Sequence, residues 1–187
     1  MENRRIQGRY IGIVAYTYLL LPLLIFILGY CKWFYAVPIC VVLLMSFKMM
    51  TKVIDLNNIE SIGTKERHTL IYALLVIIVW VIISGIGDLV PQNTDQIYRN
   101  TIFELLVENE WPVRIELGSR GSTRVLCYYI GFWMPSALIG KVFGLWAGYF
   151  AQIVWAALGI YLCYLLLCVI LNKIKLWPLF AFIAFGG

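Results

Sequence analysis

The chain has 187 residues, of which 62% are hydrophobic and only 13% are charged, and its mean hydropathy is +0.85. Soluble domains carry about 25% charged residues, so this composition indicates a membrane protein and excludes an ordinary soluble domain. The net charge of +5 lies mainly at the ends of apolar runs, where Lys and Arg set orientation and meet lipid headgroups. We therefore expect membrane lipids, and no nucleic acid, as partners.

The first half of the chain contains three apolar runs that suit transmembrane helices. They cover residues 10–30, 33–50 and 69–86, and a helix needs about 20 residues to cross a ~30 Å hydrocarbon core. The short link between the first two runs predicts a tight helical hairpin. The third run is rich in Ile and Val, but a sustained run of this length in lipid forms a helix.

The second half of the chain begins with the one long polar segment, residues 87–125. Apolar sequence then runs from 125 to 171, which is long enough for two spans, with the break expected near the glycines of residues 140–148. The run at 176–187 is shorter than a span, so we expect a truncated sixth span and a longer protein. The predicted fold is all-α, a polytopic transmembrane helical bundle of about five spans plus this sixth.

Two regions follow from this order. Residues 1–68 are expected to form an N-terminal transmembrane hairpin with a cytoplasmic connector, and residues 69–187 the main membrane region. Three arginines within the first nine residues favour a cytoplasmic N-terminus in the plasma (inner) membrane. Three spans then place the loop 87–125 on the extracytoplasmic side.

The first half of this loop predicts an amphipathic helix over residues 95–110. Asp95 and Arg99 form an i,i+4 pair in the favoured order, and Pro112 follows the helix. One apolar face would lie in the membrane interface, toward lipid, and its residues are Tyr98, Ile102, Leu105 and Leu106. Residues 114–124 are expected to form a polar return.

Asp88 is the main candidate for chemistry. Gly85 and Gly87 precede it, so the backbone there can turn sharply. A carboxylate at headgroup depth could accept a proton from an incoming hydroxyl or bind a divalent cation on a diphosphate. The alternative is that the acid simply ends the third span in water. Asp95 has its own alternative, as a first-turn acid that faces the helix dipole.

Other polar residues of the loop could contact a substrate. Arginines can hold phosphate through two hydrogen bonds, although surface arginines more often contact headgroups. The candidate substrate-binding residues are Gln92, Arg99, Trp111, Arg114, Arg120 and Arg124. A single histidine, His68, and five cysteines without a CxxC pair predict no metal site built by the protein.

The order of these features resembles a known pattern. A span ends in Gly87-Asp88, a loop with an amphipathic helix follows, and the return YYIGFWMPSALIGKVFG precedes a span near Trp146. Over residues 69–171 this layout resembles the front part of the C-type (GT-C) glycosyltransferases, integral membrane enzymes that use lipid-phosphate sugar donors and include protein O-mannosyltransferases. The stretch 111–144 also resembles an uncharacterised bacterial family of polytopic membrane proteins.

The resemblance implies sugar transfer from a polyprenyl-phosphate donor to an acceptor at the extracytoplasmic face. Asp88 would be the catalytic base, Asp95 a second carboxylate, and the loop arginines would hold the donor phosphate. An acidic pair is common in the family, whereas Leu89 follows Asp88 here, which departs from the metal-dependent version.

Alternatives from other classes stay open. The chain could be a non-catalytic scaffold or a subunit of a transporter or flippase for lipid-linked glycans. Ionisable residues are almost absent from the middle of the spans, which disfavours an ion-coupled transporter. The phosphate-binding and hydrolase motifs of soluble enzymes are missing from the sequence.

Overall fold

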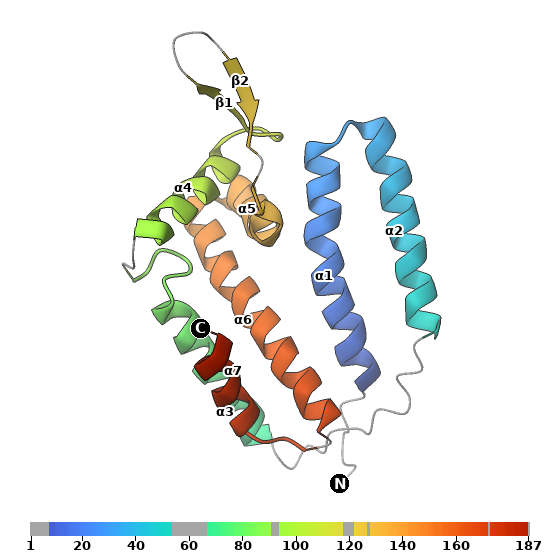
Figure 1. The fold of residues 1–187 in the computed structure, drawn as a ribbon, viewed down its shortest axis with the longest axis vertical. Helices are drawn as coiled ribbons and strands as arrows, with labels where there is room; N and C mark the ends of the chain where they lie inside the picture. Colours follow the sequence, from blue (N-terminus) through green and yellow to red (C-terminus); the bar gives the residue numbers. More distant parts are fainter. Residues whose placement is uncertain are drawn as a thin grey trace.

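The computed structural model of the chain describes residues 8–53, 67–90, 94–117, 122–126, 128–171 and 173–186. Within these residues the fold is mostly helical, with seven α-helices, one short 3₁₀ helix and one two-stranded sheet. The helices lie side by side, and the sheet projects from one end of the molecule (Figure 1).

Helices α1 (Gly8–Tyr30) and α2 (Trp33–Val53) form the expected hairpin, since only two residues join them. Figure 1 shows α1 between α2 and the long helix α6 (Leu145–Ile170). The ring of Tyr18 stacks on that of Trp155 with centroids 4.1 Å apart, and the Tyr18 hydroxyl donates to the Trp155 carbonyl oxygen at 3.2 Å. The hairpin is therefore attached to the rest of the bundle through α1.

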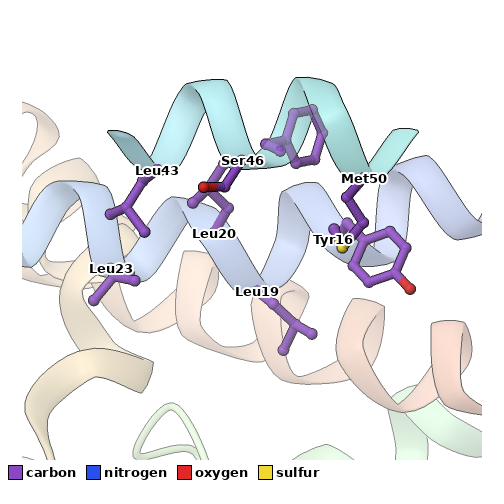
Figure 2. A pocket seen from close by; sticks show the side chains of 8 residues that line it. Tyr16, Leu19, Leu20, Leu23, Leu43, Ser46 and Met50 are labelled. Carbon is purple, nitrogen blue, oxygen red and sulfur yellow. The ribbon is translucent and has the colours of Figure 1, made fainter. Parts of the chain in front are cut away.

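A pocket of about 270 Å³ opens between α1 and α2 (Figure 2). Both helices contribute to its walls, which are almost entirely apolar. The lining residues are Tyr16, Leu19, Leu20, Leu23, Leu43, Ser46, Phe47 and Met50. Such a surface suits hydrocarbon, and the hydroxyls of Tyr16 and Ser46 are the polar side-chain groups in its lining.

Among the residues that the structure describes, three helical segments are long and apolar enough to cross a membrane: Tyr10–Tyr30, Trp33–Lys52 and Leu145–Ile170. Helix α3 (Arg67–Ile83) has 17 residues and is roughly 25 Å long at 1.5 Å per residue, slightly less than the hydrocarbon core. Helix α7 (Trp177–Gly186) has 10 residues. These lengths support an integral membrane protein.

The apolar sequence from 125 to 171 contains one helix of span length and not the two that its length predicts. The 3₁₀ helix η3 (Ile130–Trp133) leads into α5 (Met134–Phe143), which has only 10 residues. Gly144 follows with φ +94°, a left-handed conformation that favours glycine. The break therefore falls among the expected glycines, but it leaves α5 too short to span.

Gly140 and Gly148 bring α5 and α6 into close contact across this turn. A Cβ on Gly148 would lie 3.0 Å from the Gly140 Cα and 3.1 Å from Phe103 Cζ. A Cβ on Gly140 would lie 2.8 Å from Val107 Cγ2. We call these two residues the glycine seat, because the missing side chains leave the space that Phe103 and Val107 occupy.

Helix α4 (Thr94–Glu108) rests on the glycine seat through Phe103 and Val107, which the expected apolar face did not include. Both are buried in a cluster with residues of α5 and α6. Of the expected face, Leu106 is buried and Ile102 and Leu105 pack against the same cluster, whereas Tyr98 is 67% exposed. The protein therefore covers most of the expected face, and contact of Tyr98 with lipid stays a prediction.

The expected polar return is a β-hairpin, which corrects the all-α prediction. Strands β1 (Arg114–Leu117) and β2 (Ser122–Val125) pair antiparallel, with Arg114 opposite Val125 and Leu117 opposite Ser122. The hairpin follows the C-terminal end of α4 and points away from the helices (Figure 1).

Substitution of Gly140 by Ala tests the glycine seat. The new Cβ meets Val107 and the backbone of Gly148, so we expect a loss of about 1–3 kcal/mol in the free energy of unfolding. Gly131→Ala is the matched control, because a Cβ there meets nothing within 4 Å. The melting temperatures of both variants are measured by thermal unfolding in detergent micelles. Equal melting temperatures would show that the glycine seat does not stabilise the fold.

Candidate functional site

The turn after α3 places Asp88 against the side of α6. Gly85, Gly87 and Asp88 all have positive φ, at +85°, +85° and +59°. A Cβ on Gly87 would lie 2.5 Å from Ile153 Cγ1 and 3.1 Å from the Tyr149 carbonyl oxygen, so only glycine fits there. Asp and Asn are among the few other residues that adopt the left-handed conformation readily, which explains Asp at the next position.

A pair of carboxamides from α4 holds the Asp88 carboxylate. The Asn100 Nδ2 donates to Asp88 Oδ1 at 2.6 Å, and the Gln96 Nε2 donates to Asn100 Oδ1 at 3.2 Å. The same Gln96 nitrogen donates to the Gly85 carbonyl oxygen at 3.1 Å. Asn100 is buried, while Asp88 is exposed. The bond from Gln96 turns the Asn100 amide so that its nitrogen faces Asp88.

Asp95 and Arg99 form the predicted pair on the exposed side of α4. The Arg99 Nη2 lies 2.6 Å from Asp95 Oδ2, and the two side chains are 45% and 60% exposed. An exposed pair of this kind contributes only a few tenths of a kcal/mol. The guanidinium therefore keeps donors that an anionic ligand could use.

A cavity of about 140 Å³ lies beside these groups, between the turn, α4, η3 and α6. Its wall combines aromatic rings with three polar side chains, and its residues are Ile86, Gln96, Arg99, Tyr129, Phe132, Trp133 and Gln152. Gln152 is only 2% exposed, and its buried Oε1 has no hydrogen-bond partner within the described part of the chain. Asp88 is not part of the wall, but it is joined to Gln96 through Asn100.

An aromatic cluster borders the cavity at the start of η3. The Tyr128 and Trp133 rings stack with centroids 6.1 Å apart, and the Tyr129 and Trp133 centroids are 5.8 Å apart. The Tyr128 hydroxyl donates to the Tyr129 oxygen at 2.6 Å. This hydrogen bond raises the pKa of Tyr128 above its ordinary value, so the phenol is neutral at physiological pH.

Trp111 lies at the other end of α4 and has a structural position. Its Nε1 donates to the Leu106 carbonyl oxygen at 2.8 Å. Its ring lies against Gly29, where a Cβ would be 2.5 Å from Trp111 Cε3. The first contact joins Trp111 to α4 and the second joins it to α1. Trp111 is not among the residues that line the cavity.

Lys141 caps the C-terminal end of α4. Its Nζ donates to the carbonyl oxygens of Val107 and Asn109 and lies 5.2 Å from the Trp111 ring centroid. A cation at this end balances the negative pole of the helix. Burial in this contact lowers the pKa of Lys141, and Glu110 opposes the shift.

The remaining candidates are not gathered at the cavity. Arg114 and Arg124 lie on the β-hairpin, beyond the C-terminal end of α4 (Figure 1). Gln92 and Arg120 fall outside the described residues. Among the described residues no group of three or more His, Cys, Asp or Glu side chains could hold a metal ion, so we assign no residue to a metal.

Sequence reasoning missed Asn100, Gln152 and the aromatic wall. Asn100 looked like one more polar residue of an exposed helix, because its burial depends on how α4 is rotated. Gln152 did carry a signal, since it is the one side-chain amide among the 26 residues of α6. A polar side chain inside a span is a functional candidate by default.

Asn100→Leu tests the hold on Asp88. The change removes the hydrogen bond from Asn100 to Asp88 and the one from Gln96 to Asn100. We therefore expect a loss of about 1–3 kcal/mol in the free energy of unfolding. Amide hydrogen exchange should accelerate in residues 84–90. Thr101→Val is the control on the same helix, because its exposed hydroxyl bonds only to the Ile97 carbonyl oxygen. Similar exchange in both variants would show that Asn100 does not order the turn.

Comparisons with protein-family models, with curated protein sequences and with solved structures found no match to this chain. The fold and the site therefore stand on the geometry above, and the resemblance to GT-C glycosyltransferases remains an expectation drawn from the order of residues.

Proposed function

We propose that the chain is a membrane glycosyltransferase that moves a sugar from a polyprenyl-phosphate donor to an acceptor hydroxyl at the extracytoplasmic face. The observation that carries this proposal is the Asp88 carboxylate, held by Asn100 in a turn that packs on α6. Arg99 and a partly aromatic cavity lie on the other side of the same carboxamide pair. A base, a cation and a small cavity at one membrane boundary are what such a transfer needs.

The reaction assigns one role to each group. The acceptor oxygen attacks the anomeric carbon, its proton passes to Asp88, and the bond between that carbon and the phosphate oxygen breaks. Asn100 occupies Asp88 Oδ1, so Oδ2 is the oxygen that takes the proton. Arg99 balances the charge that develops on the departing polyprenyl phosphate.

Asp95 has a supporting role in this scheme. Its carboxylate lies 2.6 Å from the Arg99 guanidinium, so it holds Arg99 in place rather than acting as a second base. Arg114 and Arg124 lie on the β-hairpin and are not among the residues that line the cavity, so we assign them to lipid headgroups.

The depth of the site supports a lipid-linked donor. The Gly87–Asp88 turn packs against Tyr149 and Ile153, which belong to the second and third turns of α6. The site therefore lies near one end of a span-length helix, where a phosphate on a lipid chain would lie.

Asp88→Asn tests the base. Asn tolerates the left-handed conformation, so the protein should fold and insert, while sugar transfer should fall at least ~10²-fold. The assay follows radiolabel from a panel of undecaprenyl-phosphate-linked hexoses in membranes that contain the full chain. Glu108→Gln, an exposed carboxylate on α4, should keep the rate. Transfer that persists in Asp88→Asn would show that Asp88 is not the catalytic base.

Single cysteines test the proposed orientation. In a background without other cysteines, the native Cys31 and a Leu89→Cys variant should react with a membrane-impermeant maleimide in intact cells. Both residues are exposed, and both lie on the extracytoplasmic side of the membrane in the proposed topology. Lys52→Cys, at the opposite end of α2, should react only after permeabilisation. Reaction of position 89 only after permeabilisation would place the site in the cytosol and refute the proposal.

A further inference from the structure

The short helix α5 has one buried side and one exposed apolar side. The buried side contains small residues such as Ala137 and Gly140, which lie against α4 and α6. The exposed side consists of four large apolar side chains at neighbouring positions of the helix, and the most exposed of them, Phe143, is 75% exposed. We call this side the open face of α5, and its residues are Leu138, Ile139, Val142 and Phe143.

The one charged residue of α5 is directed toward α4 and not toward the open face. It is Lys141, whose Nζ donates to the carbonyl oxygens of Val107 and Asn109 at the end of α4. The open face is therefore apolar throughout. A surface of this kind is unfavourable in water, so it requires an apolar cover.

The open face continues onto the exposed side of α6, which shows what this cover is. Trp146 lies directly across the Gly144 turn and is 72% exposed. Phe150 and Val154 follow at four-residue spacing and are also exposed, so the three side chains form one stripe along the helix. Because α6 is long and apolar enough to cross a membrane, this stripe contacts acyl chains. The open face lies at the end of the same stripe.

The glycine seat fixes the height of α5 along α6. Gly140 lies against Gly148, which is three residues, or roughly 5 Å, from the start of α6. The 26 residues of α6 are about 39 Å long, more than a ~30 Å hydrocarbon core. An exposed tryptophan in the first turn, Trp146, is typical of the membrane interface. These features place α5 at the boundary between headgroups and acyl chains, at the end of the molecule that carries α4 and the β-hairpin (Figure 1).

We propose that α5 is an interfacial helix, whose open face is inserted among the acyl chains of the leaflet on the Asp88 side and which does not cross the membrane. Its 10 residues are about 15 Å long, half of the hydrocarbon core. The partner is bilayer lipid and not a second copy of the chain, because the open face continues the lipid-contacting stripe of a span. Since α4 rests on α5 through the glycine seat, this insertion sets the depth of α4 and of the Asp88 turn. The inference goes beyond the proposed transferase and does not depend on it.

An interfacial α5 also determines the side on which the chain leaves the membrane. With α6 as the crossing that follows the β-hairpin, Lys173 and Lys175 lie on the side of Lys52. Figure 1 shows the C-terminal end of α6 near the N-terminal end of α1. A second crossing in α5 would instead place both lysines on the side of Asp88.

Nitroxide labels on single cysteines measure the depth of α5. The full chain, without its other cysteines, is reconstituted in vesicles of phosphatidylcholine and phosphatidylglycerol. Val142→Cys and Phe143→Cys place a label on the open face. Val42→Cys, exposed near the middle of α2, is the hydrocarbon control, and Arg124→Cys, exposed on the β-hairpin, is the water control. Each label is tested for collisions with oxygen, which concentrates in hydrocarbon, and with a water-soluble nickel chelate.

We expect both α5 labels to collide readily with oxygen and several-fold less with nickel than Arg124→Cys does, at a depth shallower than Val42→Cys. Melting temperatures equal to that of the unlabelled chain exclude unfolding as the cause. Nickel collisions as frequent as at Arg124→Cys would place the open face in water and overturn the proposal. Protection from both reagents would show that a protein covers the face, and a depth equal to that of Val42→Cys would show a crossing helix. Either result also overturns it.

A maleimide that cannot cross the membrane tests the side of the link after α6. Lys173→Cys should react from the same side as Lys52→Cys and from the opposite side to Leu89→Cys. Reaction of Lys173→Cys together with Leu89→Cys would show that α5 crosses, and it would refute the interfacial helix. Neither measurement involves sugar transfer, so the interfacial helix and the transferase stand or fail separately.

Discussion

The close approach of α4 to α5 and α6 is the constraint on which the site depends. Phe103 and Val107 occupy the space left by the glycine seat, Gly140 and Gly148. This contact sets the rotation of α4 about its axis. It also fixes which residues one turn earlier, among them Asn100, face the α3 turn.

The polar groups of the site are therefore positioned by apolar contacts some distance from them. Lys141 and Trp111 secure the C-terminal end of α4, and the glycine seat holds its middle. The N-terminal half is left to make hydrogen bonds with the α3 turn. A ligand at the cavity would meet groups whose geometry is already set, which lowers the entropy lost on binding.

Much of the architecture follows from sequence alone, but the assembly of the site does not. Hydropathy predicts the hairpin of residues 10–50 and an apolar helix after residue 68, although α3 is shorter than the expected span. The glycines before Asp88 predict a sharp turn. Periodicity also locates α4 and part of its buried face, including Leu106. It omits Phe103, because the space that this ring occupies is left by Gly148, which is distant in the sequence. The β-hairpin and the short α5 escape prediction since each depends on a local turn, such as Gly144, and not on composition.

The left-handed backbone at Asp88 has an energetic consequence. A residue with a Cβ in this conformation costs roughly 1 kcal/mol relative to glycine, and glycine stands at two of the three preceding positions. A third glycine would relax the turn but would remove the carboxylate. The strain at position 88 is therefore opposed by the hydrogen bond that Asn100 donates to this carboxylate.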